Sequence, residues 1–398
     1  MGKIVFFVAL IMLFPEGCGK KSEIEQSQPL YRMPRLVNDD VNETDAADML
    51  ARINKAKALL AKRELEFSKT FSGAFNPNVL LAVSALSDPF SPIELVYVSG
   101  NGQAVTEGFS VTKAGDLGVG SPYSVLRTDS AEELAVLAIK TVLKQSDGYQ
   151  EVVYTPYHKM LDTKEVRRAG YSYLMQCAMA AAADLRRQRI VSQAFPKFLV
   201  ADVFRPELPI MLAIIEHVSP FEFVRLARRI EESEFVFADN RLHIYSREKA
   251  EIEAIKRLAR KVLVVVGANQ ESAYDFSKSN MGARGLKQMI EGTYWSVREQ
   301  YPEASLPEAF EQAMISHVTA FKASYLLLDA DLLQAKRAGI DTGDQNIGLF
   351  LAATYNGGSG RAVAALSSER SWLDGLWPET RIYVREYAAL SAAFEESP

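Results

Sequence analysis

The sequence of 398 residues predicts a mainly α-helical protein that begins with a smaller α+β region. Apolar residues recur at helical spacing through much of residues 151–398, whereas residues 93–98 (IELVYV) are β-branched and aromatic and precede the turn sequence SGNG. The hydrophobic fraction of 48% is enough for two or three domains with buried cores. We therefore expect an α+β domain over residues 44–150 and a helical domain over residues 151–398.

In the α+β region we expect a helix, then a hairpin, then a second helix. The first helix spans about residues 44–67, and its apolar face is formed by Met49, Ile53, Ala56 and Leu60. The hairpin joins residues 93–98 to an extended run that ends at Val111. Residues 131–144 are expected to be helical. No motif in this region points to a function.

The helical region is expected to start where Thr163 caps a helix that runs to about Arg189. Further helices are predicted over residues 206–217, 221–232, 246–260 and 307–336. Residues 262–266 (VLVVV) are rich in β-branched side chains, which predicts a strand-like segment.

Composition and charge argue against several classes of function. The formal net charge of −5 gives no basic surplus for binding nucleic acid. The two cysteines, Cys18 and Cys177, form no Cys-x-x-Cys motif, and the four histidines lie too far apart in the sequence for a metal-binding set. We expect no metal and no cofactor. A neutral polymer or a protein is the expected partner.

The N-terminus has the features of an export signal. Lys3 precedes an apolar run that is too short for a membrane span of roughly 20 residues. Residues 15–18 (PEGC) resemble the lipobox of bacterial lipoproteins, in which the cysteine is acylated. We therefore expect a signal peptide over residues 1–18, lipidation at Cys18 and a polar linker over residues 19–43.

Four short motifs follow one another in the second half of the chain. They are ESAYDF at 271–276, GARGLKQM at 282–289, AATYNGG at 352–358 and PETRIYV at 378–384. In this order they resemble the motifs of the soluble lytic transglycosylases, a family with a lysozyme-like fold. That family has Glu-Ser-x-aromatic, Gly-Ala-x-Gly-Leu-x-Gln, Ala-Tyr-Asn-x-Gly and Glu-Thr-x-x-Tyr-Val. The resemblance covers residues 200 to 390 approximately.

The resemblance implies a lysozyme-like catalytic domain with a small β-hairpin. It also implies an enzyme that cleaves the β-1,4 bond between N-acetylmuramic acid and N-acetylglucosamine in peptidoglycan. In that family one glutamic acid protonates the leaving oxygen and then acts as a base, because the muramoyl 6-hydroxyl closes onto C1 and leaves a 1,6-anhydro end. Such a glutamic acid needs a pKa that is raised by a poorly hydrated pocket.

Two glutamates are candidates for this acid. The spacing of the motifs favours Glu271, which opens the first of them. Glu216 is the rival, because it ends the apolar segment at 208–215 and begins a Glu-x-x-x-Pro pattern that also resembles the end of the family's catalytic helix. If Glu216 is the acid, residues 221–268 are an insertion between the catalytic helix and the hairpin. Otherwise Glu216 is a helix-terminal acid paired with a nearby arginine.

The resemblance assigns the remaining motif residues to the substrate-binding cleft. They are Gln288, Met289, Tyr355, Asn356, Glu379 and Tyr383. Lys287 stands where the family usually has Met. Trp372 and Trp377 are candidates for stacking on sugar rings. Each of these side chains also has a structural alternative, which is packing between helices.

We therefore predict an exported lytic transglycosylase that acts on peptidoglycan glycan strands and is held at a membrane by an N-terminal lipid. Gly19, directly after the cysteine, is similar to the outer-membrane class of lipoproteins, so the expected place is the periplasmic face of that membrane. Without lipidation the protein would be soluble in the periplasm. The alternatives are a muramidase-type hydrolase and a catalytically inactive peptidoglycan-binding lipoprotein of the envelope. Anhydro ends, reducing ends or no cleavage would distinguish the three.

Overall fold

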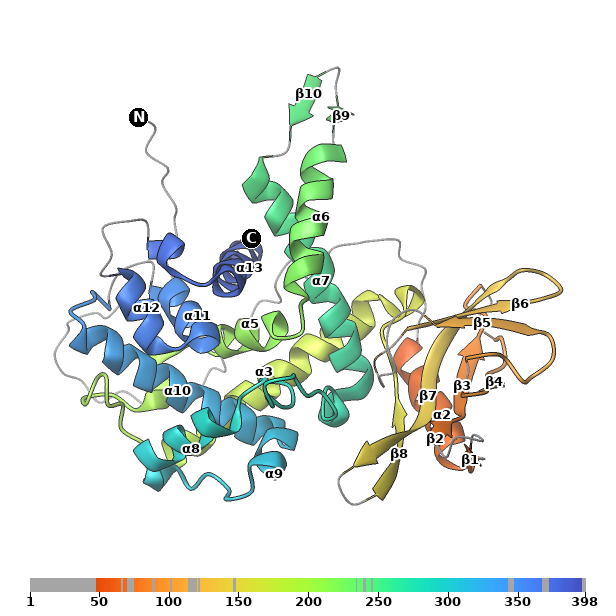
Figure 1. Cartoon of the computed structure of the whole chain (residues 1–398), viewed down its shortest axis with the longest axis horizontal. Helices are drawn as coiled ribbons and strands as arrows, with labels where there is room; N and C mark the ends of the chain where they lie inside the picture. Colours follow the sequence, from red (N-terminus) through yellow and green to blue (C-terminus); the bar gives the residue numbers. More distant parts are fainter. Residues whose placement is uncertain are drawn as a thin grey trace, which may run out of the picture.

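The computed structural model describes residues 48–65, 67–69, 75–87, 90–100, 102–113, 120, 122–145, 148–233, 235–238, 241–244, 246–342, 347–366 and 372–395. The predicted signal peptide, Cys18 and the linker lie outside these residues. Over the part described, the protein is mainly α-helical, which confirms the predicted class. Antiparallel strands form its N-terminal part and a helical body forms the rest (Figure 1).

The N-terminal part consists of the helix α2 (Met49–Ala61) and a six-stranded antiparallel sheet. The apolar face of α2 carries the four residues predicted to form it, and they pack against one face of the sheet. The strands are β3 (Val79–Ser84), β4 (Glu94–Val98), β5 (Phe109–Lys113), β6 (Tyr123–Arg127), β7 (Glu133–Gln145) and β8 (Gly148–Tyr154). Their order is β4-β3-β7-β6-β5, with β8 also paired to β7. A separate ribbon is formed by β1 (Phe67–Lys69) and β2 (Phe75–Pro77).

In this region the predicted helix over residues 131–144 is wrong, and the predicted hairpin after residues 93–98 is right only in part. The expected helix over residues 131–144 is the strand β7, which pairs with β3, β6 and β8. Residues 134–139 (LAVLAI) are all buried, because both faces of the sheet are covered, and such a continuous apolar run is not distinguished from a helix by periodicity. The predicted turn after β4 exists, since the N–H of Gly102 donates to the O of Ser99 at 2.8 Å. Across this turn Val98 forms an antiparallel bridge with Ala104, so the hairpin forms next to the turn. Further along, the predicted pairing is wrong, because β5 pairs with β6, and β4 has β3 as its strand partner.

The helical body is built from helices of very different lengths. They are α3 (Lys164–Arg187), α4 (Val200–Val203), α5 (Glu207–Ile215), α6 (Pro220–Ser233), α7 (Arg247–Asn269), α8 (Glu291–Gln300), α9 (Phe310–Ile315), α10 (His317–Arg337), α11 (Ile347–Gly357), α12 (Ser359–Leu366) and α13 (Pro378–Glu395). Four short 3-10 turns accompany them, η1 (Lys159–Leu161), η2 (Gln270–Ser272), η3 (Pro302–Ala304) and η4 (Trp372–Gly375). Thr163 caps α3 as predicted, because its side chain accepts from the N–H of Val166 at 3.3 Å. The helices α6 and α7 pack side by side and lead into the ribbon β9 (Phe235–Ala238) and β10 (Arg241–Ile244), which projects from the body (Figure 1).

The predicted strand-like segment at 262–266 is wrong, because these residues lie inside α7. This part of α7 crosses α3 at very short range. A Cβ on Gly170 would lie 2.1 Å from the O of Leu263, and a Cβ on Gly267 would lie 2.0 Å from the O of Val166. The close crossing buries the valines in helix packing, and this burial overrides their β propensity.

The predicted helix over residues 307–336 is divided at Ser316 into α9 and α10. The backbone of Ser316 is extended, with φ −75° and ψ 103°, and its side chain accepts from the N–H of Thr319 at 3.4 Å. Ser316 therefore caps α10.

The sheet and the helical body share buried clusters. Val166 of α3 and Val264 of α7 pack with α2 and one face of the sheet, while Val265 and the segment 274–276 contact the other face. The predicted domain limit at residues 150–151 falls within β8, and it stays a prediction. None of the helices in the described residues is long and apolar enough to cross a membrane.

Candidate active site

The helix α5 is buried along its length from Leu208 to Ile215. It is apolar on all sides because α3, α7, α10 and α13 all contact it. Glu216 directly follows its last residue, and the side chain is only partly exposed. A carboxyl group at the end of such a helix is poorly hydrated, which favours its protonated form.

Tyr383 of α13 is a close polar partner of Glu216, since its hydroxyl donates to Oε1 at 2.7 Å. Burial raises the pKa of Glu216 to about 7, although the Tyr383 hydrogen bond and the positive charge of Lys287 act to lower it. The negative charge of Glu379 adds to the rise. Glu216 is therefore protonated below neutral pH and can give up its proton near neutrality, which is what an acid that later acts as a base requires.

His217 ties the end of α5 to two other segments. Its ring stacks on Tyr274, with the ring centroids 3.5 Å apart and the planes 8° apart. Its Nε2 lies 3.0 Å from the O of Leu286 and carries the proton, because a carbonyl oxygen only accepts. Burial lowers the pKa of His217 to about 3, so the ring is neutral.

Residues 277–289 form a compact hairpin with isolated bridges between Lys278 and Arg284 and between Arg284 and Met289. Gly285 adopts φ 69°, and a Cβ at this position would lie 2.5 Å from the O of Met314. Only glycine fits here, because the hairpin backbone lies directly on the end of α9.

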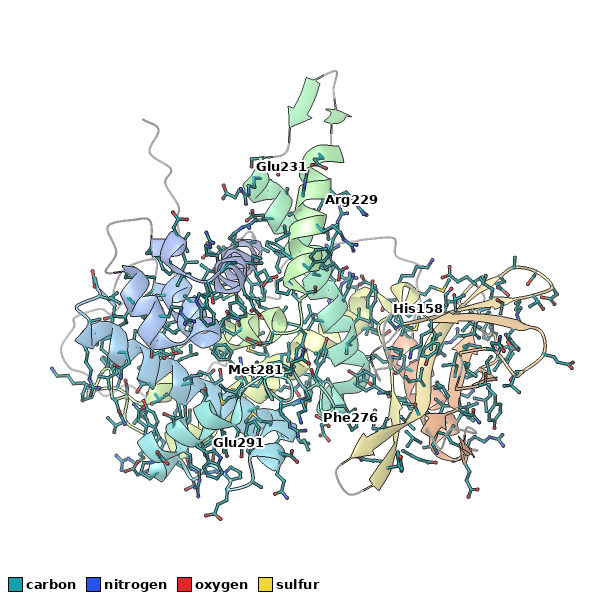
Figure 2. The ribbon with its side chains drawn as sticks, in the orientation of Figure 1. His158, Arg229, Glu231, Phe276, Met281 and Glu291 are labelled. Carbon is teal, nitrogen blue, oxygen red and sulfur yellow. The ribbon has the colours of Figure 1, made fainter. Side chains whose placement is uncertain are left out.

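Two predicted cleft residues of the hairpin have structural contacts. Nε2 of Gln288 donates to Oγ of Ser277 at 3.0 Å and to the O of Gly285 at 2.7 Å, and Met289 is buried in the helical core. Figure 2 labels Met281 near the tip of the hairpin, where it is 85% exposed, and Phe276 at its base, where it packs against the sheet.

Lys287 is fully buried beneath the hairpin. Its Nζ donates to the O of Pro209 in α5 at 2.7 Å and lies 5.0 Å from the ring centroid of Tyr355 and 5.3 Å from that of Phe321. Burial lowers the pKa of Lys287 to about 7, while the charge of Glu216 acts to raise it. Lys287 and Glu216 are therefore an electrostatically coupled pair.

The two predicted residues of α11 differ in their relation to Glu216. The hydroxyl of Tyr355 donates to the O of Lys287 at 2.8 Å. Burial, and next the charge of Glu216, raise the pKa of Tyr355 well above its usual value. The Oδ1 of Asn356 instead accepts from Oγ1 of Thr380 at 2.8 Å. Asn356 thus fixes α11 against the first turn of α13.

Glu386 is a residue that the sequence motifs did not indicate. It lies three residues after Tyr383, on the same face of α13, and is fully buried. Neither of its carboxyl oxygens has a hydrogen-bond partner among the described residues. Burial, and next the negative charge of Glu216, raise the pKa of Glu386 to about 9. Its spacing from Tyr383 was the available sequence signal.

Glu271 lies in a different setting. It is exposed in the turn η2 after α7, and its negative charge acts on Tyr173 and Cys177 of α3. The segment 271–276 reaches the site through Tyr274, which stacks on His217, and not through Glu271. Motif spacing favours Glu271, whereas burial and hydrogen bonding favour Glu216.

In the ranges that the structure describes, no group of three or more histidine, cysteine, aspartate or glutamate side chains is arranged to hold a metal ion. Comparison of the chain with protein-family models, with curated proteins and with solved structures gave no match. The function must therefore be inferred from the geometry around Glu216.

Proposed function

We propose that this protein is a lytic transglycosylase that cleaves the bond between N-acetylmuramic acid and N-acetylglucosamine in peptidoglycan, with Glu216 as its acid and base. The main support for this proposal is that residues from motifs far apart in the sequence contact the carboxyl group of Glu216 or act on its charge. Tyr383, 167 residues away, donates to it. Tyr355 is bonded to the backbone of Lys287, and the charge of Lys287 acts on Glu216.

In this mechanism Glu216 gives its proton to the glycosidic oxygen as the bond from that oxygen to C1 breaks. The hydroxyl of Tyr383 stabilises the carboxylate that forms, because hydrogen bonds to charged groups are the stronger ones. The carboxylate then takes the proton of the muramoyl 6-hydroxyl as that oxygen bonds to C1. Glu216 is protonated again at the end, and the product has a 1,6-anhydro end without the addition of water.

The electrostatics around Glu216 support both halves of this cycle. Burial favours the protonated form that must start the reaction. The positive charge of Lys287 and the hydroxyl of Tyr383 favour the charged form that must finish it. The opposing influences bring the pKa to about 7, and an acid–base group is most effective when its pKa lies near the working pH.

A lysozyme-like arrangement and a lipoprotein anchor belong to the same proposal. Under this proposal α5 corresponds to the family's catalytic helix, and α6, the ribbon β9–β10 and α7, which lie between α5 and the hairpin in the chain, correspond to an insertion. Attachment through Cys18 would hold the enzyme at the periplasmic face of the outer membrane. A Cys18→Ser protein is expected to leave the membrane fraction of cells, and unchanged fractionation would contradict the anchor.

Mass spectrometry of fragments released from purified peptidoglycan tests the reaction. We expect anhydro-muramoyl ends. Reducing ends would identify a muramidase-type hydrolase, in which the exposed Glu379 is the second carboxylate whose charge reaches Glu216. No release, with the protein still bound to peptidoglycan, would identify a non-catalytic binding protein.

A further inference from the structure

Trp377 and Arg361 form an exposed aromatic platform, named here the Trp377 platform. Trp377 is 57% exposed and directly precedes Pro378, the first residue of α13. Arg361 of α12 covers one face of the indole, with its Cζ 3.1 Å from the ring centroid. Because Arg361 covers one face of the indole and the ring is largely exposed, its other face can contact a ligand.

The Trp377 platform lies at the start of α13, the helix whose Tyr383 donates to Glu216. Glu379, two residues after Trp377, is exposed, and its charge acts on Glu216. Tyr383, which donates to Glu216, lies four residues after Glu379 and therefore about 6 Å further along the axis of α13, because each helical residue rises by about 1.5 Å. The contact between Asn356 and the first turn of α13 fixes this end of the helix.

We propose that Trp377, supported by Arg361, is a subsite that stacks on a sugar ring of the glycan strand beyond the bond cleaved at Glu216. The identity of the glycan rests on the proposed function. The C–H bonds on one face of a β-1,4-linked N-acetylated sugar carry partial positive charge, and the negative face of an aromatic ring attracts them. The guanidinium of Arg361 restrains the indole before binding, so little side-chain freedom is lost when the sugar stacks.

Binding to a peptide-free glycan tests the subsite. The probe is the β-1,4-linked hexasaccharide of N-acetylglucosamine, titrated by calorimetry into the Glu216→Gln protein so that no cleavage takes place. Adding Trp377→Ala should weaken the affinity about tenfold, the scale of one lost aromatic stack. Trp377→Phe should retain most of the affinity, and Phe90→Ala, which removes a 91% exposed ring from the sheet region, should leave it unchanged. Equal affinities of the Glu216→Gln protein with and without Trp377→Ala would overturn the proposal.

A second measurement keeps Trp377 in place. The chain has three tryptophans, so Trp295→Phe with Trp372→Phe leaves Trp377 as the only one. Its fluorescence should change on saturation with the hexasaccharide, and an unchanged spectrum would contradict the subsite. The proposed reaction is tested separately on peptidoglycan. Trp377-dependent binding without anhydro products would retain the subsite and reject the reaction, whereas anhydro products with no effect of Trp377→Ala on binding would do the reverse.

Discussion

The surroundings of Glu216 and of Glu271 differ in how many residues from distant parts of the chain contact the carboxyl group or act on its charge. Both glutamates follow a buried apolar helical segment, which is α5 in one case and the last turns of α7 in the other. Glu216 is partly buried, hydrogen-bonded by Tyr383 and coupled to the charge of Lys287, whereas Glu271 is exposed. The raised pKa of Glu216 therefore depends on burial at the end of α5, where α13 and the hairpin contribute Tyr383 and Lys287.

The largest effect on this comparison is expected from moving the hairpin away from Glu216. Gly285→Ala should lower the free energy of unfolding by about 3 kcal/mol, because the new Cβ adds strain at φ 69° and would lie 2.5 Å from the O of Met314. Gly282→Ala is the matched control, since φ is 83° there but nothing lies within 4 Å of the Cβ. This control should cost only about 1 kcal/mol. Urea unfolding measures both, and equal losses would mean that the contact with α9 is unimportant.

A smaller effect is expected from removing the hydroxyl that donates to Glu216. Tyr383→Phe should reduce the cleavage rate about 30-fold, which corresponds to about 2 kcal/mol for a hydrogen bond to a charged group. Tyr387→Phe changes the next turn of the same helix and should have little effect on the rate. Initial rates of anhydromuropeptide release compare the two proteins. A similar loss in both would point to general damage to α13 rather than to the Tyr383 hydrogen bond.

The smallest expected effect is a shift in the pH dependence of cleavage. In the proposed mechanism Glu216 must be protonated to start the reaction, so activity should fall as the pH rises through about 7. Lys287→Met removes a charge that lowers the pKa of Glu216, so the fall should move about one pH unit upward. Lys278→Met, at an exposed position of the same hairpin, should leave the profile in place. A downward shift in the Lys287→Met protein would refute the sign of this coupling.

The lowered pKa of Lys287 also leads to a prediction of how the free energy of unfolding depends on pH. Its pKa in the folded protein is about 7, below the value of 10.5 for an unperturbed lysine, so the unfolded chain binds more protons between these pH values. The contribution of Lys287 to stability therefore rises with pH across this window. Urea unfolding at several pH values should show this rise in the unmodified protein and a smaller one in Lys287→Met. Identical slopes would show that Lys287 keeps its ordinary pKa in the folded state.

Much of the fold could be predicted where the signals are local. The apolar face of α2, the cap at Thr163 and the extents of α5 and α6 follow from neighbouring residues. The strand β7 and the valine-rich end of α7 could not be predicted, because partners distant in the sequence determine their conformation. In β7 these partners are the flanking strands, and in α7 the close approach of α3.

The same distinction applies to the candidate site. Motifs pointed to Tyr383, whose hydroxyl donates to Glu216, and to Tyr355, whose hydroxyl donates to the backbone of Lys287. They did not indicate the burial of Lys287 or the neutral Glu386, since burial depends on how helices distant in the sequence, such as α5, α11 and α13, pack together. For the same reason, the sequence alone could not decide whether Glu216 or Glu271 is the acid.

Replacing each glutamate by its neutral isostere tests whether Glu216 or Glu271 is the acid. Release of anhydromuropeptides is measured for the unmodified protein and for Glu216→Gln and Glu271→Gln, with circular dichroism to verify that each is folded. Glu216→Gln should lose activity about a hundredfold or more, as expected when an acid–base group is removed. Glu271→Gln should remain within about twofold, as is usual for an exposed substitution. Loss of activity in Glu271→Gln with activity retained in Glu216→Gln would show that Glu216 is not the acid.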